Sequence, residues 1–381
     1  MFADNQRISG IQMERQFFLA YLGPVILWIA PLLPGRYGMF GILTGSFLLC
    51  IWVFFLLRQP HVCRYPEKYW GKFMSWVIAL IYESYLILTG GWLAASIGKI
   101  LQEYMIQGIP GWLIVAFVVL TALCGNATLQ TRGRFAQTAW PVVGGIVFLM
   151  LLLAAFQGQG GYGQEVQIQQ HMTNGTSMMI QEEPIWDRNM IFQTGRNAIM
   201  FVSGLLGIVL IPFAQLEYDS GAKSADHIGI PFKIMGKTVL WTGMIVVLLQ
   251  AVYGNAGAEM LAYPVLNLMA GVRIPGGFIR RMDMIFLAVL LFSLLFSLGS
   301  IFFYSKCIVY RVRGKKERGI WGSIPAAIFC FILGTIDLNG RSPIQDYVGI
   351  VSCIYLPIFL TLTFCNALLR RRPYGKQKNQ V

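Results

Sequence analysis

The chain has 381 residues, of which 56% are hydrophobic and only 12% are charged, and its mean hydropathy is +0.60. Soluble domains carry roughly a quarter charged residues, so this composition excludes a soluble enzyme and predicts a polytopic membrane protein. The net charge of +13 comes from short basic clusters that flank apolar runs. This placement favours membrane orientation and contact with the lipid bilayer over binding of nucleic acid.

About ten apolar runs are long enough to approach a membrane crossing, which takes about 20 mainly apolar residues with every backbone group bonded internally. The fold class that they predict is an all-α polytopic membrane protein. The expected spans are 16–33, 39–57, 73–98, 112–124, 140–156, 196–214, 234–253, 284–305, 320–334 and 347–368.

The positions of lysine and arginine agree with an even number of spans. With ten spans and both termini in the cytoplasm, 22 of the 30 basic residues lie in the cytoplasmic tails and loops. Cytoplasmic loops carry an excess of positive charge, so this bias predicts both ends inside.

The first expected span contains helix-breaking residues in its middle. Gly23 and Pro24 are followed by Pro31. Proline lacks a backbone donor and clashes with the preceding turn, while glycine allows the backbone to open. Such interruptions persist in hydrocarbon only where the freed groups face protein, water or a ligand.

The third expected span contains a carboxylate, Glu83, between Tyr82 and Tyr85. A charge in hydrocarbon is costly, so this side chain is expected to face the interior, to pair, or to stay protonated. One interpretation is a group that couples to protons or binds the amine of a ligand, together with Tyr82. The other is a neutral carboxyl that bonds a neighbouring helix.

A long polar connection, residues 157–195, divides the expected spans five and five. Two groups of five helices have opposite orientations in the membrane, which is the pattern of an inverted repeat. The expected organisation is a single domain with a first repeat over 1–156, an extracytoplasmic loop over 157–195, a second repeat over 196–372 and a cytoplasmic tail over 373–381.

The sixth span, which opens the second group, is also interrupted. Ser203, Gly204 and Gly207 precede Pro212. Matched interruptions in the two halves of a transporter are a pointer to a substrate site near the bilayer midplane. The alternative is that glycine and proline only allow close packing and kinks, as they commonly do in membrane helices.

Three further stretches carry a resemblance to a known family. A Tyr-Pro pair and an amphipathic stretch lead into the eighth span, a basic link precedes the fifth, and the first span has a polar opening. These stretches are Tyr263-Pro264 with 274–283, Arg132–Gln137 before Trp140-Pro141, and Ile8-Ser9-x-x-Gln12 with 25–31. In these features the sequence resembles the GerAB-type spore germination permeases, over roughly residues 8–368.

The resemblance implies the LeuT-like fold of the amino acid, polyamine and organocation superfamily, with a five-plus-five inverted repeat. It further implies a B-type subunit of a spore germinant receptor in the spore inner membrane, beside A-type and C-type subunits.

A ligand site is expected at the two interruptions. The backbone groups freed near Gly23, Pro24, Ser203 and Gly204 would bind the carboxylate and amine of a small amino acid, because the ends of half-helices attract charged groups. The side chains expected to shape the apolar part of this site are Val25, Trp28 and Leu206, with Gly207 next to them.

Two other functions stay open at this point. One is an autonomous proton-coupled amino-acid permease. The other is a structural assembly subunit with a vestigial pocket, which Val25 and the Leu205-Leu206 pair favour. No nucleophile elbow, phosphate-binding loop or metal-ligand spacing occurs, so neither a catalytic site, a cofactor nor a metal site is expected.

Overall fold

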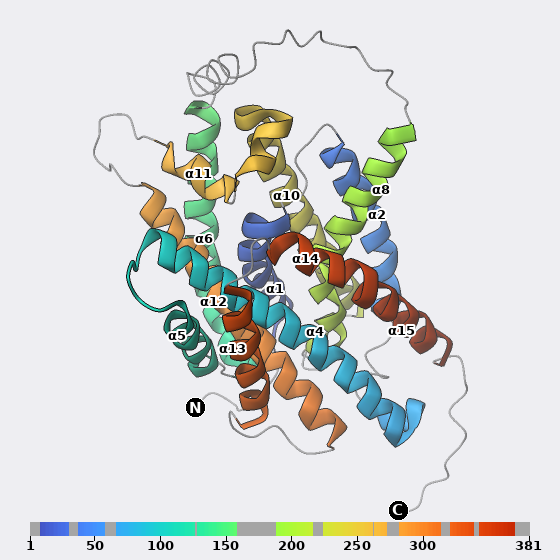
Figure 1. Ribbon diagram of the computed structural model, residues 1–381. Helices are drawn as coiled ribbons and strands as arrows, with labels where there is room; N and C mark the ends of the chain where they lie inside the picture. Colours follow the sequence, from blue (N-terminus) through green and yellow to red (C-terminus); the bar gives the residue numbers. More distant parts are fainter. Residues whose placement is uncertain are drawn as a thin grey trace, which may run out of the picture.

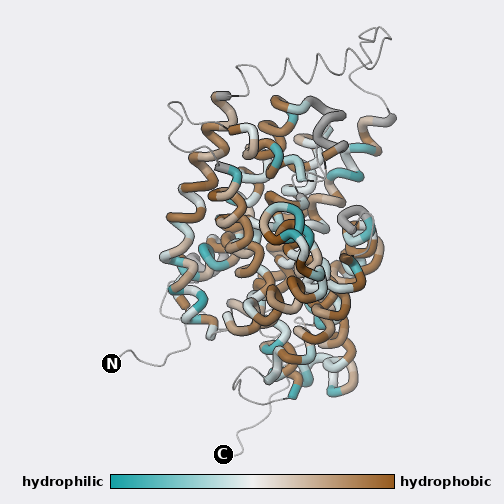
Figure 2. The backbone as a smooth tube through the Cα atoms, turned by 60° about the vertical axis from the view of Figure 1, so that its left-hand side comes forward, coloured by the Kyte–Doolittle hydropathy of each residue, from teal (hydrophilic) through white to brown (hydrophobic). Residues whose placement is uncertain are grey.

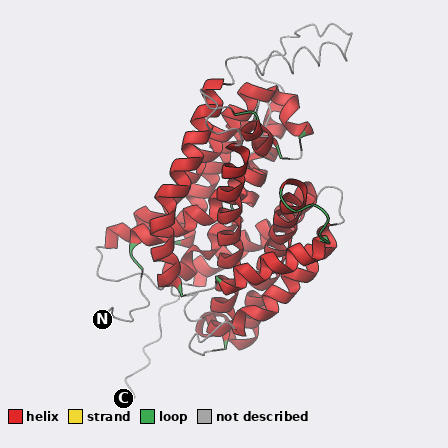
Figure 3. Ribbon diagram, turned by 90° about the vertical axis from the view of Figure 1, so that its left-hand side faces the viewer, coloured by secondary structure: helices red, strands yellow, loops and turns green. Residues whose placement is uncertain are grey.

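The computed structural model describes residues 8–29, 37–57, 66–125, 128–157, 188–215, 224–261, 263–272, 282–313, 321–338 and 343–369. All regular structure within these segments is helical (Figure 3), as the hydropathy of the chain predicts. Most of the predicted 157–195 connection, the 274–281 stretch and the 373–381 tail lie outside the described residues.

Within the described residues, seventeen helical segments follow one another. They are α1 (Gly10–Pro24), η1 (Val25–Ile29), α2 (Gly38–Leu56), α4 (Pro66–Tyr104), α5 (Gly111–Cys124), α6 (Leu129–Gln157), α8 (Arg188–Gly204), η3 (Leu206–Leu210), α9 (Ile211–Gln215), α10 (Ser224–Met260), α11 (Pro264–Ala270), α12 (Met282–Val312), η4 (Trp321–Ser323), α13 (Ile324–Leu338), α14 (Pro343–Ile350), η5 (Val351–Tyr355) and α15 (Leu356–Leu369).

Every expected span contains a helix, but not every helix is long enough to cross a bilayer. In the described part of the chain, seven helices have the length and hydropathy of a membrane span, and the bent pair 190–204 and 206–214 makes up to eight. Helix α5 has 14 residues, and α1 ends at Pro24. The fold is therefore that of a multi-pass membrane protein, while the count of about ten spans stays a prediction.

The outer faces of the helix bundle are expected to contact the hydrocarbon of the bilayer. Large apolar side chains are exposed there, such as Phe47 at 66%, Phe117 at 68% and Phe156 at 72%. Figure 2 shows hydrophobic residues over most of the length of the helices. Lipid solvates these side chains, so their exposure on the surface of the protein carries no hydrophobic penalty.

Helix α1 lies in the interior of the bundle, against α6, α10 and α12 (Figure 1). Its N-terminus is fixed by a capping box, in which Ser9 and Gln12 exchange side-chain to backbone hydrogen bonds. The capping box accounts for the Ser9-x-x-Gln12 pattern, because it satisfies two backbone donors that a helix start leaves open. The ring of Phe18 packs on that of Trp140 from α6, with centroids 4.3 Å apart.

Candidate functional site

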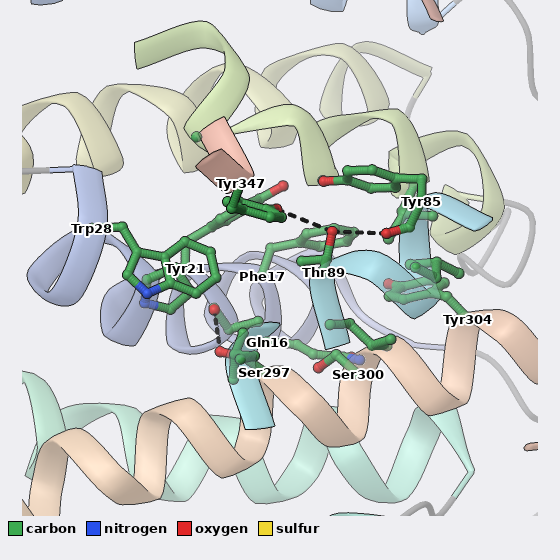
Figure 4. A pocket seen from close by; sticks show the side chains of 18 residues that line it. Gln16, Phe17, Tyr21, Trp28, Tyr85, Thr89, Ser297, Ser300, Tyr304 and Tyr347 are labelled. Carbon is green, nitrogen blue, oxygen red and sulfur yellow. Dashed lines mark hydrogen bonds between the residues drawn. The ribbon is translucent and has the colours of Figure 1, made fainter. Parts of the chain in front are cut away.

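A small cavity lies beside the interrupted part of α1, between α4, α12, the junction of α8 and η3, and the start of α14 (Figure 4). It measures about 80 Å³, which is room for roughly five to eight waters or one molecule of similar size. Its lining residues are Gln16, Phe17, Ala20, Tyr21, Pro24, Trp28, Tyr85, Leu86, Thr89, Leu93, Gly204, Gly207, Leu210, Ser297, Ser300, Ile301, Tyr304 and Tyr347.

The helix α1 changes its hydrogen-bonding pattern where the sequence predicts an interruption. The α-helix ends at Pro24 and continues as a π-helix over Val25–Ile29. Because Pro24 has no N–H, the carbonyl oxygen of Ala20, four residues earlier, loses its helical donor. The hydroxyl of Ser297 on α12 donates to this oxygen.

A second serine enters the backbone ladder of α1 one turn earlier on α12. The Gly23 N–H donates to Ser293 Oγ at 2.8 Å, and Ser293 Oγ donates to the carbonyl oxygen of Leu19 at 2.7 Å. The backbone groups freed at the first interruption are therefore bonded to α12 side chains. Contacts to a molecule in the cavity then fall mainly to side chains.

The second interruption turns the chain at the base of α8. After Gly204 the residue Leu205 leaves helical geometry with φ −98° and ψ 16°, a 3₁₀ helix follows, and the two segments meet at 43°. Gly207 faces the cavity, and a Cβ atom there would lie 3.0 Å from Tyr21 Oη. A larger residue at Gly207 would thus take up cavity volume.

Several buried polar atoms of the lining have no partner within the described residues. They are both amide atoms of Gln16, the hydroxyls of Tyr21 and Tyr304, and Nε1 of Trp28. Buried polar groups in proteins nearly always have a hydrogen-bond partner, so a set that converges on one cavity points to water or a polar ligand there.

Aromatic rings pack together on the η1 side of the cavity. Trp28 meets Trp92 edge to face with centroids 3.8 Å apart, and Trp92 stacks on Tyr347 at 4.8 Å. The hydroxyls of Tyr347 and Thr89 are 3.0 Å apart. These contacts tie α14 and α4 to the end of η1.

Four of the residues predicted from the sequence line the cavity, namely Pro24, Trp28, Gly204 and Gly207. Four others, Gly23, Val25, Ser203 and Leu206, are buried in the packing next to it.

The remaining two predicted residues lie further along α4 and do not line the cavity. Glu83 Oε2 accepts a hydrogen bond of 2.7 Å from Ser305, and its Oε1 is buried without a partner. The ring of Tyr82 packs on Phe213 and Phe359.

The sequence matches the spore germination protein family over residues 28–159 and 192–340, which is most of its length. The chain belongs to this family. The match agrees with the resemblance to GerAB-type permeases. None of the curated proteins matches the sequence significantly.

Solved transporters share the fold of this spore germination permease. A nucleobase-cation-symport-1 family transporter, Mhp1, in a closed conformation with bromovinylhydantoin bound, aligns with a TM-score of 0.58 at 15% identity, over 98% of this chain and 83% of its own. A Na⁺-coupled sialic acid symporter in a substrate-bound outward-open state aligns with a TM-score of 0.50 at 14% identity, over 97% and 79%. At these identities the likeness establishes the fold, which is the predicted LeuT-like transporter fold.

The residues predicted from the sequence did not include the side chains that form most of the polar lining of the cavity. Gln16 is the first residue of the first expected span, and the serines of α12 lie inside the eighth expected span. A usable signal was present, because Ser293, Ser297, Ser300 and Tyr304 repeat every three or four residues in an otherwise apolar helix.

The residues that line the cavity include no charged side chain. All 18 lining residues are described, and none carries an ionisable acidic or basic side chain of the Asp, Glu, Lys, Arg or His type. Within the described residues no three His, Cys, Asp or Glu side chains come together as a metal site would require.

Proposed function

We propose that this spore germination permease is the B-type subunit of a germinant receptor and that it binds a small amino acid in the cavity beside Pro24 and Gly204. The observation that carries the proposal is the convergence of unpartnered polar atoms on a small cavity between two interrupted helices. Glycine and alanine have about five or six non-hydrogen atoms, a size in keeping with the room for a few waters.

Binding would act by shifting the balance between two arrangements of the helices, and a ligand does so only as far as it binds one arrangement more tightly. The change would then pass to A-type and C-type partner subunits. The basic-residue bias supports an orientation with both termini in the cytoplasm of a spore inner membrane. The proposed repeats are 1–156 and 196–372, joined by the 157–195 loop.

A substitution at Gly207 tests the site. We expect Gly207→Leu to lower the affinity for glycine, L-alanine and L-valine at least about tenfold, or about 1.4 kcal/mol, because the new side chain occupies the cavity. Isothermal titration calorimetry on the purified chain in nanodiscs gives the affinities.

The matched control is Gly236→Leu on α10, where a Cβ atom has nothing within 4 Å. If Gly207→Leu bound these amino acids as the unaltered chain does, the ligand would have to lie elsewhere. Uptake of a labelled amino acid by vesicles that contain this chain alone would instead support an autonomous permease.

A further inference from the structure

A buried guanidinium lies directly behind one wall of the cavity. Arg132 stands in the first turn of α6, and the residue is only 4% exposed. Its Nη2 donates to the carbonyl oxygen of Phe296 at 3.0 Å and to Ser300 Oγ, and Nη1 donates to the carbonyl oxygen of Gly125 at 3.4 Å. Ser300 lines the cavity, so one side chain separates this charge from the cavity.

The charge of Arg132 has no carboxylate partner among the described residues. Its remaining contact is with the ring face of Phe296, at 4.5 Å from the centroid, and its Nε has no partner. The absence of a side chain at Gly299 allows this approach, since a Cβ atom there would lie 3.0 Å from Nη1. A buried charge without a counter-charge is costly, so its surroundings favour a negative group.

The cavity wall next to Arg132 offers the Tyr304 hydroxyl as a donor and carries no opposing charge, while Ser300 accepts from Arg132 and donates to the carbonyl oxygen of Phe296 on its own helix. Tyr304 follows Ser300 by one helical turn and also lines the cavity, and its buried hydroxyl has no partner within the described residues. Hydrogen bonds to a carboxylate are stronger than those between neutral groups, and an electrostatic field acts further where water is excluded. This side of the cavity therefore suits a carboxylate better than any neutral group of the same shape.

We propose that the carboxylate of the ligand lies at the Ser300 and Tyr304 side of the cavity, and that Arg132, acting through Ser300, selects ligands that carry this carboxylate. The inference rests on the proposed amino-acid site and adds which group of the ligand is recognised and where. Arg132 is a positioning residue, because it does not itself line the cavity.

The test compares acids with their amides on the full-length chain in nanodiscs, by isothermal titration calorimetry. One pair is the best binder among glycine, L-alanine and L-valine with its amide, and the other is propionate with propionamide, which lack the amine. We expect each acid to bind at least about tenfold more tightly than its amide. In Arg132→Gln this acid-to-amide ratio should fall toward one, and Arg132→Lys should restore much of it.

Arg134→Gln is the matched control, because it removes a charge from the exposed face of the same helix and should leave the ratio unchanged. Should Arg132→Gln fail to fold, Ser300→Ala tests the same ratio. Equal binding of acid and amide by the unaltered chain overturns the inference, as does binding of no acid at all. Propionate binding without amino-acid binding would support the role of Arg132 while contradicting the proposed amino-acid ligand.

Discussion

Serine hydroxyls on α12 replace the backbone partners that α1 loses around Pro24. Ser297 donates to Ala20, and Ser293 bridges Gly23 and Leu19. Unpaired backbone groups in hydrocarbon cost several kcal/mol each, so the interruption of α1 can persist only with such partners. The serines thus satisfy backbone groups of an irregular helix at the cavity wall.

Removing one of these hydroxyls should destabilise the permease. We expect Ser293→Ala to lower the free energy of unfolding by about 1–3 kcal/mol, because the Gly23 N–H and the Leu19 carbonyl oxygen lose the hydroxyl that bridges them and bond again only if α1 closes its own ladder there. Thermal unfolding of the purified protein measures the change. Ser84→Ala is the comparison, since the hydroxyl of Ser84 bonds its own helix at an exposed position. Equal effects of the two variants would contradict the role given to Ser293.

At the scale of elements, close packing of α2 on α8 holds the helix that leads into the second interruption. Gly41 and Gly45 are four residues apart, as in the small-residue patterns at membrane helix interfaces. A Cβ atom at Gly41 would lie 2.4 Å from Cβ of Asn197, and one at Gly45 would lie 2.8 Å from the ring of Phe201. The backbone of α8 can come this near only because both positions lack side chains.

Filling this interface should displace α8 and with it the cavity wall at Gly204. We expect Gly41→Leu to destabilise the protein by about 1–3 kcal/mol, the usual cost of overpacking, and to weaken ligand binding as well. Thermal unfolding and calorimetric titration provide the two measurements. Gly145→Leu on the exposed face of α6 has nothing within 4 Å and should leave both unchanged. If Gly41→Leu were as stable as the unaltered protein, close packing of α2 on α8 would not be needed for stability.

At the scale of the whole molecule, Glu83 distinguishes a proton-responsive permease from a passive binding subunit. Its carboxyl joins α4 to α12 through Ser305, on the same two helices that supply much of the cavity wall. A proton on this group would alter a contact between these helices without touching the ligand, and any coupling to binding would be reciprocal.

The variant Glu83→Gln mimics a carboxyl that is always protonated. We expect amino-acid binding by the unaltered protein to change over about pH 5 to 8, a range that a buried carboxyl can reach, and binding by the variant to lose this dependence. Titrations in nanodiscs across that range decide the question, with Glu67→Gln as reference, an exposed position at the start of α4 before the break at Gly71. A pH profile that is identical with and without Glu83 would leave it the neutral structural carboxyl that was the alternative interpretation.

Much of the fold, but only part of the cavity, was accessible from the sequence. Hydropathy placed a helix in each expected span, and the Gly-Pro and Ser-Gly pairs located both interruptions. The polar lining was less accessible, because Gln16, Ser300 and Tyr304 sit in apolar helices. The spacing of Ser300 and Tyr304 indicates a shared helix face but not that this face lines a cavity. Short helices such as α5 also leave the number of spans undecided by length alone.

The sequence by itself determined that the chain lies in a bilayer as helices and where two of them lose regular bonding, since both depend on local composition and backbone chemistry. Only the tertiary structure decided which groups receive the freed bonds and which face the cavity. Ser293 and Gly23 are 270 residues apart, and Arg132 and Ser300 are 168 apart. Such partners depend on how the helices are rotated and packed against one another, which no local pattern in the chain specifies.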